Sequence, residues 1–491
     1  MRRLAWRGVG ALLAVALAAP AQAQPVGLPS MGAASSAELS PTLERTLGDA
    51  IMEQGRRDPT YIDDPDVNQY LTELGRKLVS GSNNPQQHIS VFALRDPQIN
   101  AFALPGGYIG IHSGLVVSSD DESQLAAVVS HEIGHVLQRH VARGMTQQAQ
   151  SGHLMMASVA AALLAALAGS GDLAMGVAAF GQAAAVDRQL GFSRQAEQEA
   201  DRIGLQMLSR AGFDPRGMVQ MFHRLMNASR LNEGTGGGAY VSTHPLSIQR
   251  MSDIENRIRE TRVSAHQDSD TFWYVRAKLR VIQARDTPVQ RTAAAEFNRE
   301  TRARQGVSQS AAWYGLAYAA WRNGDLKGAD QALQNARKGG INSPEIASLA
   351  SALALKQGKA GEALSTAQAA WTRWPGNIGV ALSVVAAMQQ SGQDRQAVSF
   401  LDQRIKQWPG QPRLHQLQAQ SYERLGQPVE ARRAMAEYYK QIGALPTAVE
   451  QLQQARSMSK DFYVQSQLDV QIRTLQERVK SDRELLEQFK Q

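Results

Sequence analysis

The spacing of hydrophobic residues changes several times along the chain, and each change predicts a different element. From Leu43 to Leu78, apolar residues recur at helical spacing among charged ones. Ile89 to Leu94 is a short, mostly apolar run, which is typical of a strand. Asn100 to Val117 has β-branched and aromatic residues on both sides of Pro105-Gly106-Gly107. This pattern predicts a pair of strands around a tight turn.

Helical spacing returns after Asp120 and Asp121, two acids that suit the positive end of a helix dipole. Apolar residues from Leu125 to Leu137 repeat at helical intervals, and we expect Gly144 to end this helix. Two more helices are predicted at 193–210 and 218–229, and the second leads into a glycine-rich loop at 232–238.

Residues 154–186 are unusually apolar and rich in Ala and Gly. The uncharged run from Met155 to Ala168 is shorter than the roughly 20 residues that span a membrane. This length favours a helical hairpin that lies on the core. The alternative is a surface that contacts membrane or a client protein.

The last third of the chain contains a repeat of 34 residues. The glycines and alanines of the repeat are Gly324, Gly358, Gly392, Gly426, Ala329, Ala363, Ala397 and Ala431. A 34-residue period with a turn glycine and a small residue five positions later is typical of tetratricopeptide repeats. We expect four units of two antiparallel helices at 310–343, 344–377, 378–411 and 412–445. Residues 446–491 are expected to form capping helices.

The N-terminus predicts export from the cytoplasm. Three arginines precede an apolar run from Val9 to Ala19, and Ala21-Gln22-Ala23 follows it. This is the pattern of a secretory signal peptide, residues 1–23, cleaved after Ala23. Cleavage lowers the formal charge from +7 to +4, so the basic balance gives little reason to expect a nucleic-acid partner. A signal on a chain without cysteine suits the periplasm of a Gram-negative bacterium.

His131-Glu132-Ile133-Gly134-His135 is the motif that carries chemistry. Side chains four positions apart share a helix face, so both imidazoles can bind one metal ion. Glu132, about 100° round the helix, can reach a water on that metal. Zinc would lower the pKa of the water toward about 7, and Glu132 would accept its proton during attack on a peptide carbonyl. A helix with two structural histidines is the alternative interpretation.

A catalytic zinc ion takes three protein ligands and keeps one position open. The helix at 193–210 offers Glu197, Glu199 and Asp201. Glu197 and Asp201 share a face, and Glu199 points about 200° away from Glu197. The spacing leaves open which glutamate is the ligand, and a solvated face with ion pairs to neighbouring arginines is a further alternative.

His131 to His135, with Glu197-Gln198-Glu199-Ala200-Asp201-Arg202 downstream, resembles the gluzincin metallopeptidases of the HtpX and CAAX prenyl protease type. The resemblance covers about residues 40–260. It implies one Zn²⁺ per chain with Glu197 as third ligand, from the family pattern Glu-x-x-Ala-Asp. It also implies that Asp201 supports the site from behind the ligands.

The segment Asn100 to Ile109 is similar to the strand that precedes the zinc helix in this family. The resemblance implies a substrate edge strand to which an extended peptide adds by main-chain hydrogen bonds. Its candidate residues are Asn100, Phe102, Gly106 and Gly107. The alternative for Asn100 and the glycines is an ordinary tight turn.

His244 follows the glycine-rich loop in Ser242-Thr243-His244-Pro245. It is either a surface histidine in a turn or a fourth, regulatory ligand that fills the open zinc position as a lid. The remaining histidines lack ligand-spaced partners and are expected to be structural or solvated. Among them, His140 should lie on the helix face opposite His131.

The expected fold class is α+β, mainly α: a gluzincin domain with a small β-sheet, then an α-solenoid of tetratricopeptide repeats. The expected divisions are 24–265 for the metallopeptidase domain, 266–309 for a helical linker, 310–445 for the repeats and 446–491 for the caps.

A signal, a catalytic domain and repeats in this order resemble the periplasmic BepA-type proteases. That resemblance implies cleavage of misfolded or stalled outer-membrane proteins, and binding to the β-barrel assembly machinery through the repeats. Chaperone-like activity and peripheral membrane contact are compatible with it. The alternative function is a chaperone or scaffold in which proteolysis is repressed.

Overall fold

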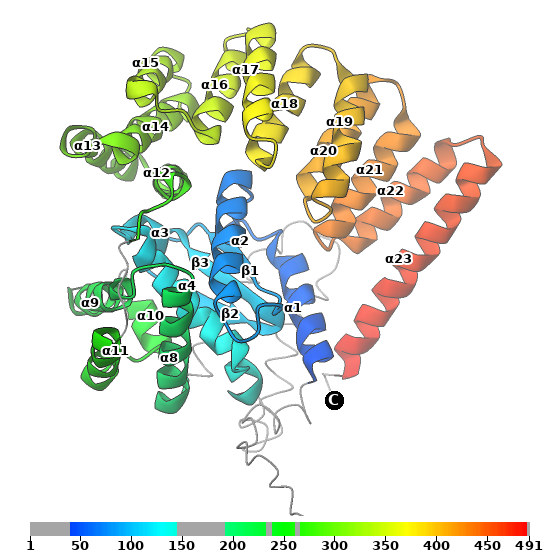
Figure 1. Cartoon of the computed structure of the whole chain (residues 1–491). Coiled ribbons are helices and arrows are strands. Elements are labelled where there is room, and N and C mark those ends of the chain that lie inside the picture. Colours follow the sequence, from blue (N-terminus) through cyan, green and yellow to red (C-terminus); the bar gives the residue numbers. More distant parts are fainter. Residues whose placement is uncertain (1–39, 145–191, 232–237, 261–265, 489–491) are drawn as a thin grey trace, which may run out of the picture.

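The computed structural model describes residues 40–144, 192–231, 238–260 and 266–488. The predicted signal peptide, the apolar segment 154–186 and residues 232–237 of the glycine-rich loop lie outside the described residues. An N-terminal α+β domain is followed by an arc of paired helices, which curves over that domain (Figure 1). The α+β, mainly α class is therefore confirmed.

The N-terminal domain consists of a small sheet surrounded by helices. Its elements are α1 (Pro41–Gly55), α2 (Pro65–Ser80), β1 (Ser90–Leu94), β2 (Ala101–Leu104), the 3₁₀ turn η3 (Pro105–Gly107), β3 (Tyr108–His112), α3 (Ser113–Ser118), α4 (Glu122–Leu137), α8 (Arg194–Arg210), α9 (Arg216–Leu231), α10 (Gly238–Thr243) and α11 (Ile248–Glu260). The helices predicted at 193–210 and 218–229 are confirmed as α8 and α9.

The sheet has the order β1-β3-β2, with β1 parallel and β2 antiparallel to β3. The predicted strand pair is confirmed in β2 and β3, but its extension to Val117 is wrong, because α3 begins at Ser113. The Ser113 hydroxyl donates to the carbonyl of Asp96. Gly114 lies so close to the Pro97 carbonyl that a Cβ would come within 2.1 Å of it. These contacts turn the chain away from the sheet.

The helix predicted to run to Gly144 ends at Leu137 instead. Gln138 and Arg139 form a turn in which Arg139 has a positive φ of 53°, and residues 140–144 are helical again. A non-glycine residue in this region is uncommon, and the hydrophobic pattern gives no sign of it. The break changes the direction of every side chain after Leu137.

The arc is made of helices that pack mainly on their sequence neighbours. They are α12 (Asp270–Gln283), α13 (Thr287–Ala303), α14 (Gly306–Arg322), α15 (Leu326–Ala336), α16 (Pro344–Lys356), α17 (Ala360–Arg373), α18 (Ile378–Gln390), α19 (Asp394–Gln407), α20 (Pro412–Arg424), α21 (Pro428–Gln441), α22 (Leu445–Met458) and α23 (Phe462–Gln488). The four repeat glycines have φ between 70° and 80° in the turns between helices. This conformation suits glycine and explains its recurrence.

The arc contacts the N-terminal domain at both of its ends. At one end, Lys278 of α12 pairs with Asp64 and Asp66 at the start of α2. At the other, Arg478 of α23 pairs with Glu53 of α1. Part of the inner side of the arc is therefore occupied by the chain's own α2 (Figure 1).

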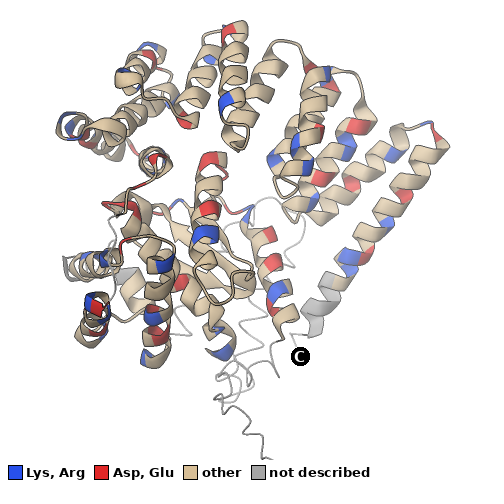
Figure 2. Ribbon diagram, viewed as in Figure 1, with Lys and Arg blue, Asp and Glu red and all other residues tan. Residues whose placement is uncertain are grey.

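Basic and acidic residues are intermixed along the described helices (Figure 2). Among the residues that the structure describes, no helix combines the length and apolarity needed to cross a membrane.

Candidate metal centre

Two histidines of α4 face a common point inside the N-terminal domain. Asp121 is the N-cap of α4, and its side chain accepts a hydrogen bond from the Gln124 backbone amide. His131 and His135 follow one turn apart and are fully buried. Their Nε2 atoms lie 3.0 Å apart. Two ring nitrogens directed at each other in a buried place need a proton or a cation between them.

The close crossing of α4 and α8 brings a carboxylate to this point. A Cβ on Gly134 would come within 2.9 Å of the Ala200 carbonyl, and one on Gly204 would come within 3.0 Å of the His131 amide. The two backbones therefore touch at two glycines on opposite helices. Glu197, one turn before this contact, is 1% exposed and reaches both histidines.

The spacing of these atoms fits one metal ion. Glu197 Oε2 lies 3.5 Å from His131 Nε2, and Glu197 Oε1 lies 3.4 Å from His135 Nε2. Atoms bound tetrahedrally to zinc at about 2.0–2.1 Å lie roughly 3.4 Å from each other. His131, His135, Glu197 and His244 offer ligand atoms that all lie within 4.8 Å of one another. The chemistry of this donor set therefore fits zinc.

His244 occupies the fourth corner of the cluster. It follows α10 and is fully buried, with Nδ1 3.0 Å from Glu197 Oε1 and 3.4 Å from His131 Nε2. The Tyr240 ring stacks on it with the centroids 4.5 Å apart. The alternative of a surface histidine is wrong, because His244 is inside the site.

Glu132 lies at the edge of the same cluster. Its carboxylate is fully buried, and Oε1 lies 3.6 Å from His244 Nε2. The Tyr240 hydroxyl donates to the same oxygen at 3.3 Å. Oε2 has no hydrogen-bond partner among the described residues. A buried oxygen without a partner is costly unless a ligand or a reacting group uses it.

Asp201 and Arg250 contact His131 and Glu197 from outside the cluster. Asp201 Oδ1 lies 2.9 Å from His131 Nδ1, on the ring side opposite the cluster. Arg250 of α11 donates to both oxygens of Asp201 at 2.7 Å, and its Nη1 lies 2.6 Å from Glu197 Oε2. Arg250 was not predicted, because its position 49 residues after Asp201 has no helical relation to it.

These contacts shift the protonation of the buried groups. Burial lowers the pKa of His131, but hydrogen bonds to Asp201 and Glu197 outweigh it and raise the pKa to about 9. Burial holds the pKa of His135 well below its usual value. Burial opposes ionisation of Glu197, yet the charge of His244 and the hydrogen bonds of the histidines keep its pKa well below the usual range. The carboxylate is therefore ionised and available to a cation.

The prediction that His140 lies on the opposite face is wrong, because the turn at Arg139 returns it to the site. Its Nδ1 lies 3.0 Å from His135 Nδ1, and its Nε2 lies 3.3 Å from Glu199 Oε2. Burial lowers its pKa to about 4. Glu199, the alternative third ligand, is thus directed at His140 and not at the cluster.

The predicted edge-strand residues lie beside the metal centre and not within its ligand cluster. β2 forms an outer edge of the sheet and packs against α4. The Asn100 carbonyl accepts from the His112 amide, and the Phe102 side chain is fully buried. Gly106 and Gly107 have φ of 76° and 87° in a tight turn against α1. These contacts give Asn100, Phe102, Gly106 and Gly107 structural roles in the strand and its turn.

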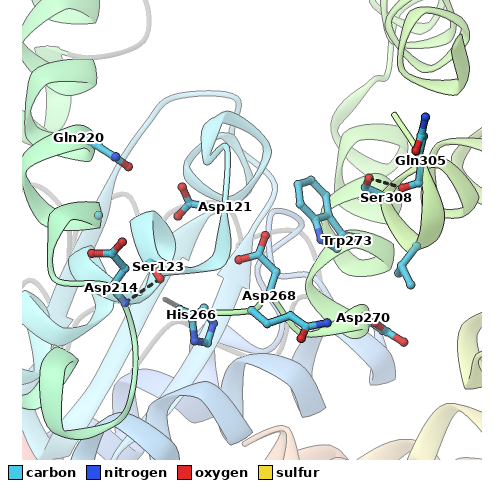
Figure 3. A pocket seen from close by; sticks show the side chains of 13 residues that line it. Asp121, Ser123, Asp214, Gln220, His266, Asp268, Asp270, Trp273, Gln305 and Ser308 are labelled. Carbon is cyan, nitrogen blue, oxygen red and sulfur yellow. Dashed lines mark hydrogen bonds between the residues drawn. The ribbon is translucent and has the colours of Figure 1, made fainter. Parts of the chain in front are cut away.

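A second group of possible ligands lies near the junction with the arc. Glu122, His266 and Asp268 offer ligand atoms close to one another. His266 and Asp268 also line a polar cavity of about 490 Å³, together with Asp121, Asp214 and Trp273 (Figure 3). Here the Glu122 carboxylate already accepts hydrogen bonds from Tyr70, His266 and Ser269. His266 Nδ1 is 3.0 Å from the Gly212 carbonyl. Because its hydrogen bonds are satisfied, we interpret this group as a structural junction.

Comparisons with known proteins agree with this centre. The family model "Peptidase family M48" matches residues 65–258, and a "Tetratricopeptide repeat" model matches residues 354–421. The Escherichia coli K12 beta-barrel assembly-enhancing protease is 33% identical over 92% of both chains. The Schizosaccharomyces pombe mitochondrial metalloendopeptidase OMA1 is 33% identical over 41% of this chain and 56% of its own length.

The Escherichia coli metalloprotease LoiP is 28% identical over 47% of this chain and 88% of its own length. All three relatives are named as proteases, OMA1 and LoiP as metal-dependent ones, and the M48 family match spans both α4 and α8. The chain therefore belongs to peptidase family M48 and is a metalloendopeptidase that carries tetratricopeptide repeats.

Proposed function

We propose that the protein is a periplasmic zinc endopeptidase that acts on outer-membrane proteins during their assembly. The observation that carries the chemical part is the set of 3.4–3.5 Å distances from Glu197 to His131 and His135. In this proposal these three residues hold the ion, and Asp201 orients His131 through Nδ1. The donors fit zinc, because it takes imidazole and carboxylate in tetrahedral sites.

Glu132 is the proposed general base and acid. A bound zinc ion would supply Lewis-acid activation of water and of the peptide carbonyl. Glu132 accepts the proton of the attacking water and returns it to the leaving amine nitrogen. Its unpartnered Oε2 supports this role, and the Tyr240 hydroxyl orients the other oxygen.

His244 is proposed to be a regulatory ligand that closes the site. A catalytic zinc ion needs an open position for water, and His244 Nδ1 stands at the fourth corner of the cluster. Substrate would have to displace it. The lid therefore requires His244 to move away from the other ligands when substrate binds.

Substrate is proposed to add to the outer edge of β2, between Asn100 and the turn at Gly106 and Gly107, where the described part of the chain places no further strand. Unpaired main-chain groups at a sheet edge bind an extended peptide without requiring one sequence. Phe102 supports the strand from the core, because its ring covers Gly110 of β3. An unfolded β-barrel protein offers many such segments.

The biological role rests on the relatives. A protein named beta-barrel assembly-enhancing protease matches nearly the whole chain. We infer that the present chain acts on unfolded or misassembled outer-membrane proteins, and that the repeats of residues 310–445 bind the assembly machinery. The predicted signal at 1–23 supports export to the periplasm. The division into 24–265, 266–309, 310–445 and 446–491 belongs to the same proposal.

The test uses the mature full-length chain loaded with zinc and an unfolded outer-membrane β-barrel protein. We expect wild type to cleave it slowly, and Glu132→Gln to lose at least about 100-fold in rate while it keeps its zinc. His244→Ala should cleave faster than wild type. A His244→Ala rate no higher than wild type contradicts the lid.

The alternative is a chaperone or scaffold in which proteolysis is repressed. The occupied fourth corner favours it, since a closed site does not cleave. If the protein acts in cells as an enzyme, Glu132→Gln should fail to replace wild type in outer-membrane assembly. If the protein acts as a scaffold, Glu132→Gln should support outer-membrane assembly as well as wild type does.

A further inference from the structure

We propose that His140 is a positioning residue, which fixes the tautomer and the ring orientation of His135 for metal binding. The inference rests on the proposed metal ligands. The two imidazoles of α4 each present Nε2 to the cluster, so each must have Nδ1 satisfied elsewhere. His131 has the Asp201 carboxylate at 2.9 Å. His135 has a second histidine instead, with His140 Nδ1 at 3.0 Å.

The order of hydrogen bonds determines where the protons lie. Glu199 can only accept as a carboxylate, so His140 Nε2, 3.3 Å from it, carries a proton. His140 Nδ1 is then the acceptor, and His135 Nδ1 must be the donor. That tautomer leaves the lone pair of His135 Nε2 directed at the cluster, as a metal ligand requires.

The hydrogen bonds that join His135, His140 and Glu199 lie mostly inside the protein. The His140 side chain is 1% exposed, and Glu199, 18% exposed, is approached by Arg143 Nη1 at 3.5 Å. Phe192 packs against His135 with ring centroids 4.0 Å apart. Water therefore has little access to His135 Nδ1, which has His140 Nδ1 as its hydrogen-bond partner.

The backbone is strained at the position that makes the contact possible. In a continuous helix, a residue five positions after His135 would point about 140° away from it. The left-handed conformation of Arg139, φ 53°, reverses this direction. Its guanidinium pairs with Glu44 of α1 at 3.0 Å, which holds the turn. A strained non-glycine residue next to a functional site is an arrangement that other contacts must maintain.

The test compares His140→Phe with His140→Gln in the full-length chain. Phe keeps the shape but has no acceptor, whereas the Gln carbonyl accepts from His135 Nδ1. We expect zinc affinity, measured by chelator competition, to fall about 10- to 100-fold in His140→Phe and to recover to within about threefold in His140→Gln. The visible spectrum of the cobalt-loaded chain should change in the Phe variant alone. His223→Phe, an exposed histidine on α9, is the matched control.

Equal zinc affinity and equal cobalt spectra in wild type and His140→Phe overturn the proposal. If wild type itself binds no zinc, the proposed metal centre fails instead, and the two failures are distinct. If His140→Phe does not fold, Glu199→Ala replaces it. That variant removes the anchor of His140, so it should weaken zinc binding about tenfold, and Glu199→Gln should not. Unchanged affinity in Glu199→Ala then overturns the proposal.

Discussion

At the scale of single residues, the metal centre is a buried group of opposite charges. Arg250 is the cation that compensates two carboxylates at once, because it contacts Glu197 and Asp201 at 2.6–2.7 Å. Burial disfavours its charge, but the hydrogen bond and charge of Asp201 outweigh this, and its pKa is raised. Without it, two buried carboxylates would face each other.

Arg250→Met should therefore destabilise the chain more than an exposed ion pair would. We expect a loss of about 3–5 kcal/mol, the usual effect of leaving a buried charge unpaired. Urea unfolding measures it. The control is Arg257→Met on the same helix, whose pair with Asp253 is about 40% exposed at both residues, and which should lose at most about 1 kcal/mol. Equal losses in the two variants would contradict this account of Arg250.

The sequence predicts the positions of the motif residues in the site, but not the positions of the residues that surround them. Helical spacing places His131 and His135 together, because four positions is a local relation. Tyr240, Arg250 and His140 have no such relation to the motif. His140 was misplaced because one non-glycine residue with positive φ reversed its direction, and no sequence pattern marks Arg139 as that residue.

At the scale of elements, the centre depends on how closely α4 and α8 cross. Gly134 and Gly204 face the partner helix, where a Cβ would stand 2.9–3.0 Å from backbone atoms. Backbone atoms cannot move aside as a side chain can. The crossing therefore fixes the distance between Glu197 and the two histidines.

Gly204→Ala should separate the helices and weaken the site. We expect a destabilisation of about 1–3 kcal/mol, as for other overpacked interiors, together with weaker zinc binding. Gly361→Ala on α17 is the control, since nothing lies within 4 Å of its Cβ, and it should not destabilise the chain. Thermal unfolding and chelator titration report the two effects. Unaltered zinc affinity in Gly204→Ala would show that the crossing is not critical.

The sequence predicts a helix or strand where one hydrophobic period continues, but it does not predict where that element ends. The α4 pattern continues past Leu137, although the backbone turns at Arg139. The apolar residues Leu115 and Val116 look like strand, yet α3 begins because Ser113 and Gly114 contact the loop at Asp96 and Pro97. Both deviations arise from tertiary contacts.

At the scale of the whole molecule, the arc is joined to the N-terminal domain by buried charges. Lys278 lies 2.7 Å from both Asp64 and Asp66. Glu345 of α16 is 1% exposed. Burial, and then the charge of Asp66, raise the pKa of Glu345 from its usual 4.5 to about 7. The junction thus holds three carboxyl groups and a single ammonium group, that of Lys278, to compensate them.

Glu345 should make the junction less stable at alkaline pH. Below pH 4.5 the carboxyl is protonated in both folded and unfolded chains. As the pH rises from 4.5 toward 7, Glu345 ionises in the unfolded chain before it ionises in the folded chain. The free energy of unfolding therefore falls over this pH range. The gain in the free energy of unfolding that Glu345→Gln brings over wild type should be larger at pH 8 than at pH 5, by about 1–3 kcal/mol.

Urea unfolding at both pH values, with the exposed Glu362→Gln as control, measures this difference. An identical pH dependence in Glu345→Gln and wild type would contradict it.

The 34-residue period predicted the helices and turn glycines of the arc, because each repeat depends on local packing. It could not predict that α2 enters the inner side. That contact joins Lys278 to Asp64 and Asp66, more than 200 residues away, and no periodicity relates such positions.

We propose that one zinc ion is held by His131, His135 and Glu197. The most direct measurement is the zinc content per chain of the purified protein and of Glu197→Gln and Glu199→Gln. We expect one zinc per chain in wild type and in Glu199→Gln, and the loss of zinc in Glu197→Gln. Zinc retained by Glu197→Gln but lost from Glu199→Gln, or no zinc in wild type, would contradict the account.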